Sequence, residues 1–226
     1  MEIKSIATFH SPFGSKFGIP KQSNVVASLQ GTIVFEPEYR CADALRGLEG
    51  FDFLWLIWGF SANRHKAFSP VVRPPRLGGN EKVGVFASRS PYRPSPLGLS
   101  SVRLERIEWE SDNGPLIHVL GADLKDGTPI YDIKPYVPFA DAHAEARSGF
   151  VDAHSWQTLR VVFSPAVEEY LRKEGMDTEL LEQLRDVLAQ DPRPHYHADP
   201  LRVYGMTFAG IDVHFRVEGQ TLFVMP

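Results

Sequence analysis

Short runs of alternating hydrophobic and polar residues fill the first 150 positions, and prolines and glycines separate them at short intervals. This pattern is typical of all-β barrels and sandwiches. The expected strands are residues 3–9, 31–35, 53–60, 83–88, 97–109, 116–120 and 129–133, with one short helix at 42–48. The fold class predicted for this part is therefore mainly β.

One of these strands does not alternate. Residues 53–58 read Phe-Leu-Trp-Leu-Ile-Trp, so both faces of the strand are apolar. A strand of this kind has to be covered on both sides, either inside a barrel or at a subunit interface. It is the main core candidate.

The pattern changes after the small, polar stretch 141–149, which predicts a connection between domains. A strand at 156–163 leads to Ser164 and Pro165, an N-cap followed by a first-turn proline, and a helix to residue 174. A second amphipathic helix spans 178–190, and strands follow at 202–208, 211–217 and 221–225. We expect a β-barrel domain at 1–150 and a small α+β domain at 151–226.

Composition narrows the class of protein. The chain has 226 residues, 43% of them hydrophobic, and a single cysteine, Cys41. One cysteine excludes an internal disulfide and a thiolate metal cluster, and no metal is expected. The N-terminus lacks an apolar run of signal-peptide length and no stretch has the roughly 20 apolar residues of a membrane span, so we expect a cytoplasmic protein. Rossmann, P-loop, zinc-peptidase and serine-hydrolase motifs are absent from the sequence.

The net charge of −4 conceals an uneven distribution. Between Arg64 and Arg103 there are eight Lys or Arg and one acid, a local charge of +7, so the remainder carries −11. A basic run is often only a solvated face, but it is also the pattern of a surface that binds a polyanion.

Prolines and glycines surround the arginines of this basic run, at residues 72–80 and 88–98. Prolines limit the entropy lost when a loop is ordered, and the Gly78-Gly79 pair lets backbone approach a ligand. Arginines on such loops suit bidentate recognition of carboxylate or phosphate. The alternative is that these residues only form tight turns at the ends of strands.

A second cluster of polar residues lies at 121–136. Asp123, Asp126 and Asp132 fall within ten residues of one another, close to Lys134 and Tyr136. Carboxylates can hold ribose hydroxyls or an amino group, or accept a proton. Asp126 precedes a glycine and also has a purely structural explanation as a turn residue.

Six strings of the sequence resemble those of one family. They are RPPRLGGN, GVFASRSPYRPSPLGLS, DGTPIYDIKPY, LAQDPRPHY, PFGSKFGIPKQ and ADALRGLEGFDFLWL, and they extend over nearly the whole chain. They resemble the TrmO (YaeB-like) family of S-adenosylmethionine-dependent tRNA methyltransferases. The resemblance implies a single-sheet β-barrel, usually a homodimer, that methylates the exocyclic nitrogen of threonylcarbamoyladenosine beside the anticodon.

The resemblance also implies positions for the cofactor contacts. They would be Gln22, Ser23, Asn24, Ser61, Ala62, Arg89, Leu99, Asp123, Leu124, Lys125 and Asp126. The chain departs from the family pattern at Ser61-Ala62, where some relatives have His-Gln, so only backbone or packing contacts are expected there. A milder departure is Arg93-Pro94-Ser95-Pro96, where the family has Arg-Pro-Asn-Pro.

The acceptor nitrogen is conjugated with the purine and with the carbamoyl carbonyl, so it is a poor nucleophile until its proton is lost or hydrogen-bonded. Our hypothesis is that Asp126 or Tyr136 takes up or polarises that proton. The residues expected to bind the tRNA anticodon arm are Arg73, Arg76, Asn80, Arg93 and Lys134. An arginine or Lys134 would pair with the threonyl carboxylate.

The C-terminal domain is expected to help recognise tRNA, and its removal to leave cofactor binding measurable. Two alternatives remain open. A non-catalytic S-adenosylmethionine sensor would bind the cofactor without methyl transfer. An RNA-binding module would bind no cofactor.

Overall fold

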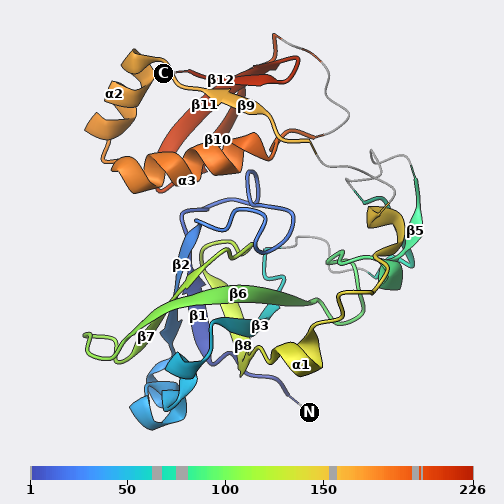
Figure 1. Cartoon of the computed structure of the whole chain (residues 1–226), viewed down its shortest axis with the longest axis vertical. Coiled ribbons are helices and arrows are strands. Elements are labelled where there is room, and N and C mark those ends of the chain that lie inside the picture. Colours follow the sequence, from blue (N-terminus) through green and yellow to red (C-terminus); the bar gives the residue numbers. More distant parts are fainter. Residues whose placement is uncertain are drawn as a thin grey trace.

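Six strands close into a barrel in the N-terminal part of the chain (Figure 1). The computed structural model describes residues 2–62, 68–74, 81–152, 157–194, 199 and 201–225. The barrel strands are β1 (Ala7–His10), β2 (Gln30–Phe35), β3 (Phe53–Gly59), β6 (Leu97–Glu108), β7 (Leu116–Leu120) and β8 (Thr128–Pro135), in the order β1-β2-β7-β6-β3-β8. Pairing of β8 with β1 closes the sheet, which confirms the predicted single-sheet barrel.

The non-alternating strand β3 lies between β6 and β8. Its inward residues Leu54, Leu56 and Trp58 are buried in the barrel core. Its outward residues, among them Trp55 and Ile57, are only half-buried. The barrel therefore accounts for one apolar face of β3 and leaves the other face partly open.

Four expected elements differ clearly from those observed, and one of them, the strand expected at 156–163, is a strand only at Arg160–Val162 among its described residues. The first strand begins only at Ala7. The expected helix at 42–48 is replaced by two 3₁₀ turns, η2 (Ala42–Leu45) and η3 (Leu48–Gly50), because Gly47 between them has φ +86° and interrupts a helical path. The expected strand at 83–88 ends after β5 (Val83–Gly84) and continues as the 3₁₀ turn η5 (Val85–Ala87).

Short elements lie outside the barrel sheet. Strand β5 pairs with β4 (Val71–Val72), and this hairpin stands to the side of the barrel in Figure 1. The other short elements in the described part of the N-terminal region are η1 (Pro37–Tyr39), α1 (Pro138–Asp141) and η6 (Gly149–Val151). None of the helices in the described ranges is long and apolar enough to cross a membrane.

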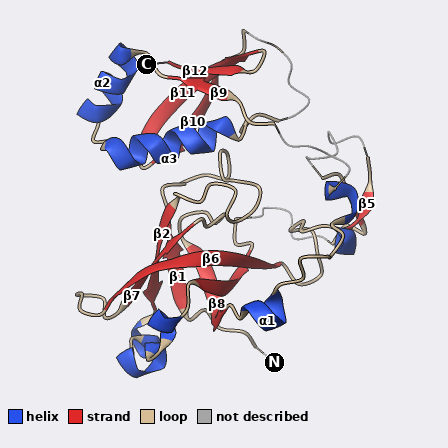
Figure 2. Cartoon of the chain, viewed as in Figure 1, coloured by secondary structure: helices blue, strands red, loops and turns tan. Residues whose placement is uncertain are grey.

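A second sheet and two helices form the C-terminal part (Figure 2). Its strands β9 (Arg160–Val162), β10 (Tyr204–Phe208), β11 (Ile211–Glu218) and β12 (Thr221–Met225) take the order β10-β11-β12-β9, with β9 parallel to β12. Helix α2 (Pro165–Lys173) begins where the sequence predicts, because the Ser164 hydroxyl accepts a hydrogen bond from the Val167 amide. Asp177 caps α3 (Thr178–Ala189) in the same way.

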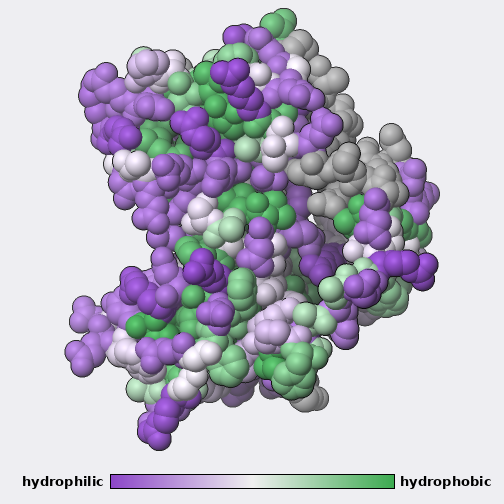
Figure 3. Space-filling model, in the orientation of Figure 1, coloured by the Kyte–Doolittle hydropathy of each residue, from purple (hydrophilic) through white to green (hydrophobic). Residues whose placement is uncertain are grey.

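The two parts share a hydrophobic core. Phe13, Val26 and Leu29, from the segment 11–29 that joins β1 to β2, are buried among residues of β10, β11, α2 and α3. The Phe13 ring meets Phe208 edge-on, with centroids 5.5 Å apart. In Figure 3, apolar surface also gathers at the waist between the two parts. Segment 11–29 is thus held by the C-terminal part, although it belongs to the barrel by sequence.

Polar contacts reinforce this attachment. The Ser28 hydroxyl donates to the Asp186 carboxylate at 2.8 Å, and the side-chain nitrogen of Gln30 donates to Glu179 at 2.7 Å. The Ala209 amide donates to the Pro12 carbonyl at 2.8 Å. Asp186 of α3 therefore faces segment 11–29, and Glu179 faces the first residue of β2.

Candidate functional site

Most of the expected cofactor residues lie at one end of the barrel, where β1 and β7 end and β2, β6 and β8 begin. Antiparallel pairing brings the loops 11–29, 85–96 and 121–127 together there. The Asn24 amide donates to the Gly121 carbonyl at 2.8 Å, and its side-chain nitrogen donates to the Ser101 carbonyl at 2.9 Å. Arg89 donates a hydrogen bond to the side-chain oxygen of Gln22. Residues 22–24, 89 and 123 thus form one cluster.

Positive backbone φ angles shape this cluster. Asn24 has φ +62° and Gly121 has φ +79°. A Cβ at Gly121 would lie 2.6 Å from the side-chain oxygen of Asn24. Glycine is therefore required at 121 both for its conformation and for the close approach of the two loops.

Asp123 is the centre of the cluster. Its carboxylate accepts a hydrogen bond from the Ser100 hydroxyl at 2.6 Å. Burial raises the pKa of Asp123 above its ordinary value, while the Ser100 hydrogen bond, the backbone amides of Asp123 and Ser23, and the charge of Arg89 act in the opposite direction. The carboxyl group therefore touches or faces three separate segments of the chain.

Asp126 has both of the roles that the sequence left open. It begins the turn into β8, with Gly127 at φ +74°. Its carboxylate also accepts a hydrogen bond from the Ser11 amide at 3.2 Å and lies 3.0 Å from His10 Nδ1. The side chain stays 44% exposed, so a substrate can reach it.

His10 is a site residue that the sequence did not reveal. It lies 116 positions from Asp126 in the chain and is the last residue of β1. Only the pairing of β1 with β8 brings the two side chains together. No local motif marks this histidine.

Other expected cofactor contacts differ in their exposure. The Leu124 side chain is 1% exposed and belongs to the barrel core, so only its backbone can face a ligand. Lys125 donates its ammonium to the Asp126 carbonyl at 2.9 Å. Leu99 is 54% exposed on the outer face of β6, opposite to the face of Ser100. Ser61 and Ala62 follow β3 in a tight turn and are exposed and half-buried, respectively.

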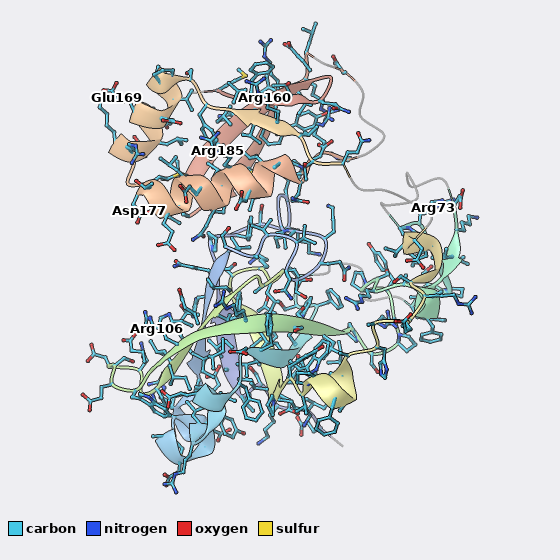
Figure 4. The ribbon with its side chains drawn as sticks, in the orientation of Figure 1. Arg73, Arg106, Arg160, Glu169, Asp177 and Arg185 are labelled. Carbon is cyan, nitrogen blue, oxygen red and sulfur yellow. The ribbon has the colours of Figure 1, made fainter. Side chains whose placement is uncertain are left out.

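The expected RNA-binding arginines differ in how far their guanidinium groups are available to a ligand. Arg73 is exposed beside β4 (Figure 4). Arg93 is half-buried, and its guanidinium donates to the Ser88 carbonyl at 2.8 Å and lies 5.8 Å from the centroid of the Phe86 ring. Arg93 thus holds its own loop together. Arg76 and Asn80 lie outside the described residues.

Tyr136 and Lys134 lie at the opposite end of β8 from Asp126. The ten residue steps from Asp126 to Tyr136 correspond to roughly 30 Å in an extended strand. The Tyr136 ring packs 5.6 Å from Trp55, and Lys134 forms an ion pair with Asp132 at 2.9 Å. Within one chain, Asp126 and Tyr136 are not brought to the same acceptor atom.

Asp191, in the described part of the tail string at 188–196, acts from the C-terminal part on the segment that precedes Gln22. Asp191 binds the Arg193 guanidinium through two 2.8 Å contacts. Burial lowers the pKa of Lys21, next to Gln22, and the charge of Asp191 raises it part of the way back. The C-terminal part therefore acts electrostatically on the segment that carries residues 22–24.

Comparison with known proteins identifies the family. Residues 8–142 match the model of the tRNA-methyltransferase O N-terminal domain, and residues 156–226 match that of the TrmO C-terminal domain. The chain belongs to the TrmO family. It is 39% identical over 220 residues to the tRNA (adenine(37)-N6)-methyltransferase of Escherichia coli, which covers 96% of this chain and 93% of that protein.

Other TrmO relatives extend this likeness. A crystal structure of TrmO from Pseudomonas aeruginosa superposes with a TM-score of 0.77 and 32% identity, covering 99% of this chain and 96% of that one. A Pyrococcus abyssi protein, whose name describes it as a probable S-adenosyl-L-methionine-binding protein, is 36% identical over 150 residues, covering 66% of this chain and 75% of that protein. The likeness in both sequence and structure therefore extends over both parts of the chain.

The residues of the barrel end fit S-adenosylmethionine. Its sulfonium and ammonium are positive, its carboxylate is negative, and its ribose carries hydroxyls. The cluster offers the carboxylates of Asp123 and Asp126 as acceptors and the guanidinium of Arg89 as an anion-binding group. No group of three potential metal ligands occurs in the ranges that the structure describes.

Proposed function

We propose that this chain transfers the methyl group of S-adenosylmethionine to the exocyclic nitrogen of threonylcarbamoyladenosine at position 37 of tRNA, beside the anticodon. The observation that carries the proposal is the assembly of residues 22–24, 89 and 123–126 at one end of the barrel, in a chain of the TrmO family. The relative from Escherichia coli is named for methylation of adenine 37 at N6. Such a substrate is consistent with a cytoplasmic protein.

The cofactor would lie against the contacting loops that carry Asn24 and Asp123, with Arg89 beside it. When bound, it supplies a methyl group that is already activated by its positive sulfur. The chain has to orient the acceptor nitrogen in line with that methyl group and to manage one proton. Positioning of this kind can provide much of a rate enhancement.

We assign Asp126 as the general base that accepts the proton of the acceptor nitrogen. Its carboxylate is partly exposed and is held in place by the Ser11 amide and His10. A fixed carboxylate at the edge of the cofactor cluster can accept the proton of the acceptor nitrogen as the methyl group transfers. His10 lies in hydrogen-bond contact with the same oxygen and can relay the proton to solvent, because its side chain is 51% exposed.

The test of this function is mass spectrometry of tRNA nucleosides after incubation with the chain and S-adenosylmethionine. We expect a mass gain of one methyl group on threonylcarbamoyladenosine, and little or none when the tRNA lacks the threonylcarbamoyl group. Methylation of both RNAs at equal rates would reject the proposed substrate. Cofactor binding without methyl transfer to either RNA would favour a sensor.

Binding of tRNA should depend on salt through exposed arginines of the basic run. Arg73→Ala should reduce the slope of log affinity against log salt by about one, because it removes one exposed phosphate-contacting charge. Arg106→Ala is the matched control, since Arg106 is half-exposed on the far side of the barrel, where it pairs with Glu108 (Figure 4). Equal slopes for wild type and Arg73→Ala in a filter-binding titration would exclude Arg73 from the RNA surface.

Arg93 is expected to behave differently from Arg73. Its guanidinium is already used by the Ser88 carbonyl. Arg93→Ala should therefore disorder residues 85–93, including Arg89, and weaken cofactor binding in addition to RNA binding.

A homodimer is part of the proposal. The outer face of β3 and β6 exposes Leu99 beside the half-buried Trp55 and Ile57, and Phe139 of α1 is 92% exposed. A second copy of the chain that covered this apolar face would bring its own Lys134 and Tyr136 toward the site of the first copy. Sedimentation velocity should therefore show a dimer that Leu99→Lys shifts toward monomer, and a wild-type monomer at micromolar concentration would contradict it.

The C-terminal part is assigned to tRNA recognition together with the barrel. Its own α2 and α3 and the tail string adjoin the cofactor end through segment 11–29. RNA that contacts both parts would therefore be held across the site.

A further inference from the structure

Three buried or half-buried side chains form a hydrogen-bonded chain that leads from the barrel core to the cofactor cluster. The indole nitrogen of Trp58 on β3 lies 3.0 Å from the Ser100 hydroxyl on β6. The same hydroxyl lies 2.6 Å from the Asp123 carboxylate. Trp58 is 8% exposed and Ser100 is 2% exposed, so solvent does not compete for these contacts.

The direction of each hydrogen bond follows from chemistry. An indole N–H can only donate, so the Ser100 oxygen has to accept from Trp58. The single hydroxyl proton of Ser100 is then free to point at Asp123, whose carboxylate oxygen accepts it in the ionised form. A 2.6 Å O···O distance lies in the range of a charge-assisted hydrogen bond to an ionised oxygen.

Asp123 transmits this orientation to the site. It interacts with the Ser23 amide in segment 11–29 and with the charge of Arg89, which itself binds Gln22. A Cβ at Gly98, two residues before Ser100, would lie 2.2 Å from the Trp58 ring, so the ring is tightly confined. Trp58 therefore provides a rigid anchor for a chain of contacts that ends at the cofactor loops.

We infer that Ser100 and Trp58 are positioning residues for cofactor binding, which act by holding the Asp123 carboxylate in the orientation that assembles residues 22–24 and Arg89 around S-adenosylmethionine. The inference rests on the proposed cofactor site. Neither residue is among the expected cofactor contacts, and neither has to touch the cofactor itself.

The test is isothermal titration of S-adenosylmethionine into full-length variants. Ser100→Ala removes the only proton that Ser100 can donate to Asp123, and we expect its dissociation constant to rise tenfold or more, since hydrogen bonds to charged groups are the costly ones to lose. Ser101→Ala makes the same chemical change one position along β6, where the Asn24 contact uses only the backbone carbonyl, and should bind like wild type. Trp58→Phe keeps an aromatic ring and should weaken binding less than Ser100→Ala.

A pH profile separates positioning from a general loss of stability. The charge that acts on Asp123 is that of Arg89, from the facing loop. Lys125 and Asp126 follow it in the chain, but their side chains contact the Asp126 carbonyl and His10, respectively, and Ser100 and Trp58 do not titrate. Loss of the Ser100 hydrogen bond favours the protonated carboxyl, so the pH below which binding weakens should move upward in Ser100→Ala. Asp123→Asn should abolish the loss of binding at low pH. In that background, a further Ser100→Ala change should alter the dissociation constant very little.

The outcomes are distinct. Wild-type affinity in Ser100→Ala, or a loss that is equal at every pH and additive with Asp123→Asn, would overturn the inference while the proposed function stands. A wild-type chain that binds no S-adenosylmethionine would overturn both. Circular dichroism of each variant without cofactor controls for folding.

Discussion

A chain that ends after residue 152 is expected to bind S-adenosylmethionine at least a hundredfold more weakly than the full-length chain, or not at all. The truncation removes β9 to β12, α2 and α3, and with them the partners of Phe13, Val26 and Leu29. Those side chains belong to the segment that carries residues 22–24. The deletion therefore disorders one wall of the cofactor site although it leaves the barrel strands intact.

The magnitude follows from burial. Each large apolar side chain stabilises a fold by about 1.5–3 kcal/mol when it is fully buried, so three of them outweigh the roughly 2.7 kcal/mol that a hundredfold change in affinity represents. The lost contacts from Ser28 to Asp186 and from Gln30 to Glu179 add to this. The sequence suggested a separable domain and measurable binding after its removal, whereas the shared core makes the opposite result the expected one.

A point variant tests the same idea without truncation. Phe13→Ala removes the ring that packs on Phe208 and should weaken both the fold and cofactor binding. Tyr170→Ala, on the exposed side of α2, is the aromatic control and should leave binding unchanged. The truncated chain provides the opposing outcome. If circular dichroism shows that it is folded and titration calorimetry gives it the dissociation constant of the full-length chain, the shared-core argument is refuted.

Asp126→Asn is expected to lower the single-turnover rate of methylation by about 10²–10⁴, the usual contribution of a general base. The amide keeps the size of the side chain but accepts a proton poorly. Binding of S-adenosylmethionine should change much less than the rate, because Asn can still accept a hydrogen bond from the Ser11 amide. Quenched-flow measurement with saturating cofactor and modified tRNA separates the two effects, and a rate near wild type would exclude Asp126 as the base.

Tyr136→Phe is the informative contrast. Within one chain the Tyr136 ring lies at the far end of β8, packed by Phe53 and Trp55, so removal of its hydroxyl should change the rate less than threefold if each site belongs to one chain. A loss as large as that of Asp126→Asn would instead show that a second copy places its own Tyr136 in the site. Mixed dimers of the two variants would then recover part of the activity.

Much of the secondary structure could be predicted because its causes are local. Strands β7 and β12 have the bounds that alternation indicates, and α2 begins at the capped Ser164-Pro165 pair. The errors fall where a local signal competes with context. At residues 42–48 helix-forming residues surround Gly47, whose positive φ divides the segment into two turns.

The candidate site also has a part that local sequence signals indicate and a part that they do not. The loops with Arg89 and Asp123 stand out in the sequence, because glycine, proline and charge are visible in one dimension, whereas Asn24 follows only from the resemblance to the TrmO family. His10 could not be identified, nor could the relay from Trp58 through Ser100, because these residues are ordinary in their local context. Their importance lies in distances across the barrel, such as the 2.6 Å from Ser100 to Asp123.

The sequence by itself determined the strand-rich class, the capped helices, the basic run and the TrmO motifs, since period, capping and composition are properties of neighbouring residues. Only the tertiary structure decided which charges are free and which are used internally, as Arg73 and Arg93 show. It also decided that the apolar side chains of segment 11–29 are buried in the C-terminal core and not in the barrel core. The physical reason is that closure of a barrel and burial of apolar surface act between residues far apart in the chain, and no local pattern records which of them will meet.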